Sequence, residues 1–131
     1  MIETFFERYG EGRYCLESVV TRSEGGINVY VGGGERPHIG TVVLSQPRPS
    51  LKCDVSISCT TSVINIPGHM DDAVAVPMAE EICKAMNQVV VVTCGIHIDN
   101  ATNKEIDKII RNGRELTKII IIRLSNKEGL I

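Results

Sequence analysis

The stretch Val89-Val90-Val91-Val92-Thr93-Cys94-Gly95 contains almost only apolar or small residues, and the rest of the fold can be worked out around it. A strand that is apolar at successive positions is typical of the middle of a sheet, where both faces are covered. We therefore expect a central strand here, buried on both faces. A polar cluster, Gly95-Ile96-His97-Ile98-Asp99-Asn100, follows at its carboxyl end.

Helical patterns lie on both sides of this strand. Before it, residues 71–86 have apolar side chains at every fourth position, which predicts an amphipathic helix with Val74, Met78, Ile82 and Met86 inward. Pro77 interrupts the pattern, so either the regular helix begins near Pro77 or a turn and a kink precede it. After the strand, Thr102-Asn103-Lys104-Glu105 is a capping box that opens a second helix. Asn112-Gly113 can end or fray that helix.

Strand patterns fill most of the region upstream. Residues 13–22 and 28–31 predict a hairpin around the flexible turn Ser23-Glu24-Gly25-Gly26. Residues 39–45 predict another strand, which we expect to stop at Gln46-Pro47-Arg48-Pro49 because proline cannot donate to a ladder.

Two more strands complete the pattern. Residues 54–62 alternate between the apolar side chains Val55, Ile57 and Cys59, which we expect to meet the core, and a face of small hydroxyls. Residues 119–124 are expected to form the last strand. Residues 1–12 and 125–131 are expected to be an N-terminal arm and a tail.

These segments predict a single domain over residues 1–131 of the α/β (α+β) class. It would contain a mixed six-stranded sheet with two helices on one face, and its helical connections would be crossovers. Two helices can cover only one face of such a sheet, and a second copy of the chain is the simplest cover for the other. We therefore expect a homodimer.

The composition argues against several classes of protein. A chain of 131 residues with a net charge of −2 and no tryptophan offers neither the basic surface nor the stacking platform that nucleic-acid binding needs. The N-terminus carries acidic residues and lacks the apolar region of a signal peptide, and no apolar run approaches the roughly 20 residues of a membrane span. The five cysteines are odd in number and show no CxxC spacing, which indicates reduced thiols in a cytoplasmic protein.

The chain has three histidines, and each lies at a junction marked by glycine or proline. They occur in Arg36-Pro37-His38-Ile39-Gly40, in Pro67-Gly68-His69-Met70-Asp71-Asp72 and in the cluster after the central strand. The second junction opens a helix, where converging N–H groups can hold a phosphate. Asp71 and Asp72 can instead simply stabilise the first turn of that helix.

His97 and Asp99 are two residues apart, so we expect them to point the same way at the carboxyl end of the central strand. Open α/β sheets place ligands in that position. The pair could bind a metal or tune the imidazole as an acid–base group. The alternative is that Asp99 or Asn100 caps the following helix, although Thr102 already supplies a cap.

The remaining candidates are phosphate ligands and hydroxyls. Gly33 and Gly34 form a permissive backbone that could approach a phosphate, but no GxGxxG or GxxxxGK[ST] context surrounds them. Arg36 and Arg48 flank proline-stiffened loops and are either phosphate ligands or ordinary solvated arginines. Ser62 belongs to the hydroxyl face of its strand.

Four motifs in the same order resemble the LpdD-like prenylated flavin chaperones, whose type member accompanies a gallate decarboxylase. They are Gly33–Gly40, Pro47-Arg48-Pro49-Ser50, Pro67–Asp72 and Gly95–Asn100, and the resemblance spans residues 10–122. It implies a non-catalytic accessory protein that binds prenylated FMN and supports its delivery to a UbiD-type decarboxylase. The arginines and the helix N-terminus would then face the phosphate, with the glycine loop and the hydroxyl strand against the rest of the cofactor.

The resemblance and the residues together define a candidate site. Its cofactor-binding residues are Gly33, Gly34, Arg36, His38, Arg48, Ser62, Gly68, His69, Asp71, Asp72, His97, Asp99 and Asn100. His38, His69 and His97 are candidate ligands for a divalent metal, and we expect no catalytic residue. Two rival hypotheses remain: a small metal-dependent enzyme with Asp71 or Asp72 as base, and a structural assembly adaptor.

Overall fold

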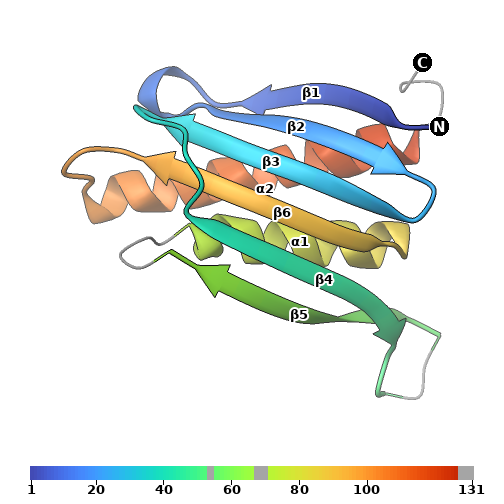
Figure 1. The fold of residues 1–131 in the computed structure, drawn as a ribbon. Helices are drawn as coiled ribbons and strands as arrows, with labels where there is room; N and C mark the ends of the chain where they lie inside the picture. Colours follow the sequence, from blue (N-terminus) through green and yellow to red (C-terminus); the bar gives the residue numbers. More distant parts are fainter. Residues whose placement is uncertain (53–54, 67–70, 127–131) are drawn as a thin grey trace.

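The structure is a computed structural model that describes residues 1–52, 55–66 and 71–126. Across these residues a mixed sheet of six strands in the order β1-β2-β3-β6-β4-β5 carries two helices on one face (Figure 1). This confirms the predicted α+β class and single-domain architecture.

The first half of the sheet is an antiparallel meander. It consists of β1 (Glu3–Tyr9), β2 (Leu16–Ser23) and β3 (Gly26–Gly34), with a single 3₁₀ turn, η1 (Gly12–Tyr14), between β1 and β2. The predicted hairpin around residues 23–26 is therefore correct. β1 replaces the predicted N-terminal arm, because Phe5 turns into the core and is 3% exposed.

The second half is built around β6 (Val89–His97), the predicted central strand. It lies between β3, to which it is parallel, and β4 (Thr41–Pro49), to which it is antiparallel. β5 (Ile57–Asn65) pairs with β4 along the sheet edge. Since β3 and β6 run in parallel, their carboxyl ends meet at the same end of the sheet, with Gly34 opposite His97.

Two strand boundaries differ from the predictions. β4 continues through both prolines, which lie beyond Ser45, where pairing with β6 ends and only β5 remains as a neighbour. β5 runs from residue 57 to residue 65 instead of from 54 to 62, so Val55 lies outside the strand and is fully exposed instead of meeting the core.

The helices α1 (Asp72–Met86) and α2 (Asn103–Ser125) pack side by side behind the sheet (Figure 1). α1 begins well before Pro77, so the proline lies inside the helix. The core lies between the helices and the sheet and includes Leu16, Val20, Val29, Val31, Val43, Met78, Ile82, Val90, Val92, Leu116 and Ile120.

The predicted last strand, residues 119–124, is wrong, because this segment belongs to α2. Its β-branched run suggested a strand, but Leu116, Ile120 and Leu124 recur every four residues and are buried, while Ile122 is 68% exposed. The packing of this helical stripe against the sheet outweighs the weak preference of β-branched residues for strands.

Asn112-Gly113, expected to end the second helix, lies in its middle instead. Asn112 Nδ2 donates a hydrogen bond of 2.9 Å to the Tyr14 carbonyl. A Cβ at position 113 would lie 2.9 Å from Val74 Cγ1, so glycine here lets α1 and α2 approach closely.

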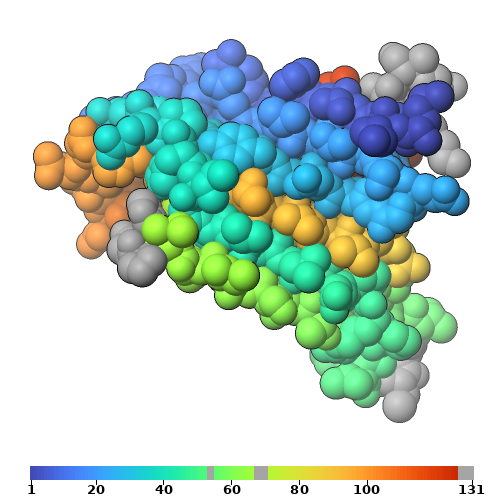
Figure 2. All heavy atoms as spheres, in the orientation of Figure 1, coloured from blue at the N-terminus to red at the C-terminus, as the bar shows by residue number. Residues whose placement is uncertain are grey.

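No helix or strand among the described residues covers the face of the sheet opposite α1 and α2. Figure 2 shows this face, on which alternate residues of the central strands are presented to the outside. In β6, Val90 and Val92 are fully buried toward the helices, whereas Val89 and Val91 on the open face are only half-buried. The prediction that this strand is buried on both faces therefore does not hold for a single chain.

Candidate functional site

The site forms where β3 and β6 end, because the connection between β3 and β4 crosses the end of β6 there (Figure 1). His38 N donates to the Gly95 carbonyl at 3.3 Å, and Gly40 N donates to the Cys94 carbonyl at 2.8 Å. A Cβ at Gly95 would collide with the His38 carbonyl group. Glycine in β6 thus allows residues 35–40 to lie directly on the strand.

Tyr30 holds the same connection from the neighbouring strand. Its hydroxyl donates a 2.9 Å hydrogen bond to the His38 carbonyl oxygen. Burial, followed by the proximity of Cys94 and Asp71, raises the pKa of the Tyr30 phenol, so it remains a hydrogen-bond donor at neutral pH. The position of His38 is therefore determined by backbone contacts on both sides.

Asp71 precedes α1 but does not cap that helix through its side chain. Its carboxylate reaches across to β6 instead, where Oδ1 accepts a 2.8 Å hydrogen bond from Ile96 N. The second oxygen, Oδ2, lies 3.6 Å from His38 Nε2. Asp71 is 6% exposed, and it occupies space that a Cβ on Gly40 would otherwise fill. It thus connects the start of α1 with β6 and His38.

His97 and Asp99 form a pair at the end of β6, as their spacing predicted. His97 Nε2 donates to Asp99 Oδ1 at 2.7 Å. This hydrogen bond is the largest cause that lowers the pKa of Asp99, followed by attraction to His97 and, more weakly, to Arg36 and Arg13. Asp99 is therefore ionised over the physiological range and holds the imidazole in one orientation.

The two histidines of the described residues converge. The rings of His38 and His97 approach edge-to-face, with their centroids 6.3 Å apart. Both imidazoles remain partly accessible, with 22% and 33% of their side chains exposed. Each has a carboxylate beside it, so both imidazoles have a polar partner at this end of the sheet.

Arg13 is a neighbour of this site that the sequence did not single out. It donates to the Asp99 carbonyl at 3.4 Å and forms ion pairs with Glu35 at 3.2 Å and Glu105 at 3.5 Å. Tyr14 adds a 2.8 Å hydrogen bond to Glu105, the acidic member of the α2 capping box. No local signal could have revealed this contact, because Arg13 and Asp99 are 86 residues apart.

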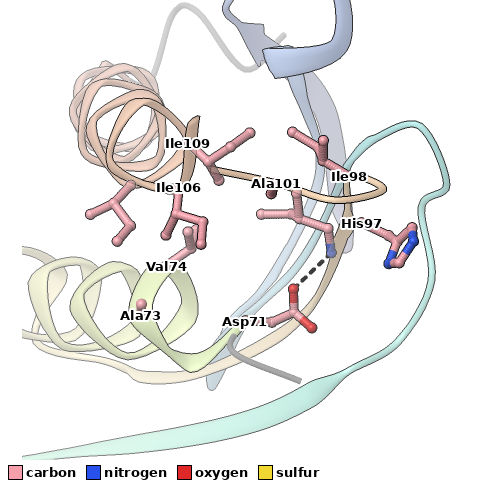
Figure 3. Close-up of a pocket in the computed structure, with 10 residues that line it drawn as sticks. Asp71, Ala73, Val74, His97, Ile98, Ala101, Ile106 and Ile109 are labelled. Carbon is pink, nitrogen blue, oxygen red and sulfur yellow. Dashed lines mark hydrogen bonds between the residues drawn. The ribbon is translucent and has the colours of Figure 1, made fainter. Parts of the chain in front are cut away.

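A cavity of about 220 Å³ opens beside His97, between the beginnings of both helices and the end of β6 (Figure 3). Its wall is mainly aliphatic, with polar groups contributed by Asp71 and His97. From α2, Ile106, Ile109 and Ile110 line it. Ile96 and Ile98 complete the aliphatic wall from the β6 side.

The structure brings most of the predicted residues to this end of the sheet. They are Gly33, Gly34, Arg36, His38, Asp71, His97, Asp99 and Asn100, with Asp72 one residue further along α1. Ser62 lies farther away, opposite Leu44 in the middle of the β4–β5 ladder. Gly68 and His69 fall outside the described residues.

Arg48 lies elsewhere. β4 runs away from the site from Thr41, so Arg48 is roughly 23 Å along the strand from the site end. There it donates to Thr60 Oγ1 at 3.1 Å and to the Pro49 carbonyl. Within one chain, the structure does not bring Arg48 together with Arg36 and the histidines.

The predicted divalent metal has no ligand set among the residues that the structure describes. No group of three histidine, cysteine, aspartate or glutamate side chains is arranged to hold an ion in residues 1–52, 55–66 and 71–126. His69, the third candidate ligand, is not among them. We therefore assign no step to a metal.

A family model for the prenylated flavin chaperone LpdD-like domain matches residues 10–125 of the 131-residue chain. The chain belongs to the LpdD-like prenylated flavin chaperones. This confirms the resemblance carried by the four motifs. No curated protein matches the chain closely enough to count as a relative.

Membership of the LpdD-like family implies association with a prenylated flavin and an accessory role. An aliphatic cavity bordered by a few polar groups, here Asp71 and His97, has the usual composition of a small-molecule site. Neither helix in the described part of the chain has the length and apolarity that crossing a membrane requires.

Proposed function

We propose that this chain is a carrier that binds prenylated FMN and supports its transfer to a UbiD-type decarboxylase, without catalysing a reaction itself. The observation that carries the proposal is the convergence of His38, His97 and Asp71 beside an apolar cavity, in a chain of the LpdD-like family. Such a site offers hydrogen bonds to the polar edge of a flavin and an apolar surface to its hydrocarbon portion.

Each group has a defined part in binding. His97, oriented by Asp99, and His38, positioned beside Asp71, would contact polar atoms of the flavin. Arg36, on the exposed connection between β3 and β4, is the candidate for the phosphate. When bound, the cofactor supplies the electron-sink chemistry of the client enzyme, and the carrier's residues bind it and orient it.

The two arginines predicted as phosphate ligands provide a matched test. Reduced prenylated FMN is titrated anaerobically into wild-type protein and into Arg36→Ala, Arg48→Ala and His97→Ala, with binding followed by absorbance and calorimetry. We expect Arg36→Ala and His97→Ala to weaken binding at least about tenfold, the effect of losing one charge-assisted hydrogen bond. Arg48→Ala should bind like the wild type, since it lies at the far end of β4.

Wild-type protein that does not bind the reduced cofactor would refute the carrier proposal. Delivery is tested separately, by mixing loaded carrier with a cofactor-free UbiD-type decarboxylase and measuring its activity. Activation should exceed that produced by the same amount of free cofactor, and equal activation by both would remove the delivery role.

We further propose that the open face of the sheet binds a second copy of the chain. Among the described residues of the sheet, charges on this face occur only at strand ends, at Arg8, Glu17 and Arg48, around an apolar centre that includes Leu44 and Val91. An apolar centre with a polar rim is the usual anatomy of an interface. A sheet of this size presents about 750 Å², close to the roughly 800 Å² that each partner contributes to a standard interface.

The dimer has its own test. Leu44→Glu places a charge at the centre of the open face and should yield monomers in sedimentation equilibrium. Ile122→Glu, at an exposed position on α2, is the matched control and should leave the assembly unchanged. Monomeric wild-type protein at micromolar concentration would show that a second copy does not cover this face.

A cytoplasmic location is also proposed. Cys15, Cys59, Cys83 and Cys94 are free thiols in the structure, which is the usual state in a reducing compartment.

A further inference from the structure

The cavity beside His97 has an unusual composition for a binding site of a phosphorylated cofactor. Its wall is provided mainly by Val74, Ile96, Ile98, Ile106, Ile109 and Ile110, with side chains from α1, α2 and the end of β6 turned toward one another (Figure 3). Ile96, Ile98 and Ile110 are only half-buried, although they pack against the core. Partly hydrated aliphatic surface of this kind favours an apolar guest.

The polar groups at this cavity restrict which part of a ligand can enter. Asp71 lines it with a carboxylate, which repels a phosphate, and Asp71 Oδ1 already accepts a hydrogen bond from Ile96 N. His97 Nε2 is engaged with Asp99. The isoleucines offer no donors or acceptors to the hydroxyls of a ribityl chain. The lining therefore suits neither the phosphate nor the ribityl chain of a flavin nucleotide, and it suits a branched hydrocarbon.

We propose that this cavity holds the isoprenoid-derived portion of the ligand and lets the protein distinguish prenylated FMN from FMN. The proposal rests on the proposed carrier function and adds the specificity determinant to it. Prenylated FMN differs from FMN by the prenyl-derived carbons. Burial of these carbons in an aliphatic pocket would raise the affinity for prenylated FMN alone. His97 borders the cavity with its imidazole turned away from the isoleucines (Figure 3), and the His38 ring lies 6.3 Å from it, so the polar part of the ring system would extend from the cavity toward these two rings.

Two small residues make the proposal testable. Ala101 and Ala73 line the cavity from the α2 and α1 sides, so Ala101→Leu and Ala73→Leu each place a larger side chain in it. Ala85→Leu is the matched control, because Ala85 is exposed near the other end of α1. Circular dichroism spectra and melting curves establish that each variant is folded.

The measurement is the ratio of affinities for reduced prenylated FMN and reduced FMN, determined anaerobically for each variant. We expect the wild type and Ala85→Leu to prefer the prenylated form by at least about tenfold, the scale on which an aliphatic pocket discriminates added carbons. Filling the cavity should reduce that preference to near unity, because the affinity for prenylated FMN should fall more than the affinity for FMN. Retention of the full preference in both filled variants would overturn the proposal.

A second measurement separates the failure of this proposal from the failure of the carrier function. The C5 alcohol 3-methylbut-2-en-1-ol is titrated into protein whose isoleucine methyl groups are labelled for NMR. Saturable shifts at Ile96, Ile106 and Ile110, without shifts at exposed Ile122, support an isoprenoid pocket even if flavin does not bind. Shifts that are absent, or equal at all isoleucines, refute it independently of the carrier function.

Discussion

Replacing Asp71 by alanine tests the architecture of the site directly. The Asp71 carboxylate is almost fully buried and accepts a 2.8 Å hydrogen bond from Ile96 N, just beyond the point where β4 stops pairing with β6. The carboxylate oxygen thus accepts the hydrogen bond that a backbone carbonyl of a neighbouring strand would accept if the pairing continued. Removing it leaves the N–H without its acceptor and removes a charged group beside His38.

The expected loss follows from these contacts. A buried donor left without its partner costs about 1–3 kcal/mol, and hydrogen bonds to charged groups lie toward the upper part of that range. We therefore expect Asp71→Ala to lower the free energy of unfolding by about 2 kcal/mol. For a domain of this size, this corresponds to a Tm lower by about 6–10 °C. Asp71→Asn keeps an oxygen acceptor and should lose less than half as much.

The assay is urea unfolding followed by circular dichroism, with Asp72→Ala as the matched control. Asp72 is the adjacent carboxylate, and its longest-range contact is a weak 3.4 Å hydrogen bond from Asn65 Nδ2. Its removal should cost less than about 1 kcal/mol, the usual value of an acidic residue in the first helical turn. Equal losses in Asp71→Ala and Asp72→Ala would refute the assigned role of Asp71.

Three further predictions concern the groups around this carboxylate. Gly40→Ala should lower the free energy of unfolding by about 1–3 kcal/mol in urea titrations, because its Cβ would collide with the buried carboxylate. In His97→Ala, the pKa of Asp99 should rise toward its ordinary value in an NMR titration, because the His97 hydrogen bond is the largest cause of its lowering. Since the Asp99 pKa is lower in the folded chain, the associated stability is present above the unfolded pKa and is lost as the pH falls below about 4. Thr102→Ala should lower the free energy of unfolding by about 1 kcal/mol, because it removes the capping box of α2.

Each of these has a control and an outcome that contradicts it. Gly25→Ala adds a Cβ with open space around it, and equal effects of Gly25→Ala and Gly40→Ala would rule out the steric argument. An Asp99 pKa that does not move in His97→Ala would show that other charges set it. Asn103→Ala, at the exposed first residue of α2, should be neutral, and a loss as large as that of Thr102→Ala would argue against the cap.

The sequence patterns that predicted the structure correctly involve residues close together in the chain. The alternation of His97 and Asp99 and the Thr102 capping box depend on residues a few positions apart, and both formed as predicted. The error at residues 119–124 has the opposite cause. An uninterrupted isoleucine run is compatible with strand or helix, and only its burial against the sheet in a four-residue period decides between them.

By itself, the sequence determined the class of the fold, the central position of β6, the start of α2 and the family, because these follow from periodicity, caps and motifs along the chain. The tertiary structure alone decided which candidates share a site. It placed Asp71 on Ile96, 25 residues away, brought His38 within 6.3 Å of the His97 ring and sent Arg48 to the far end of β4. The physical reason is that these contacts depend on strand order and on the close approach allowed at Gly40 and Gly95, and neither is encoded in any local pattern.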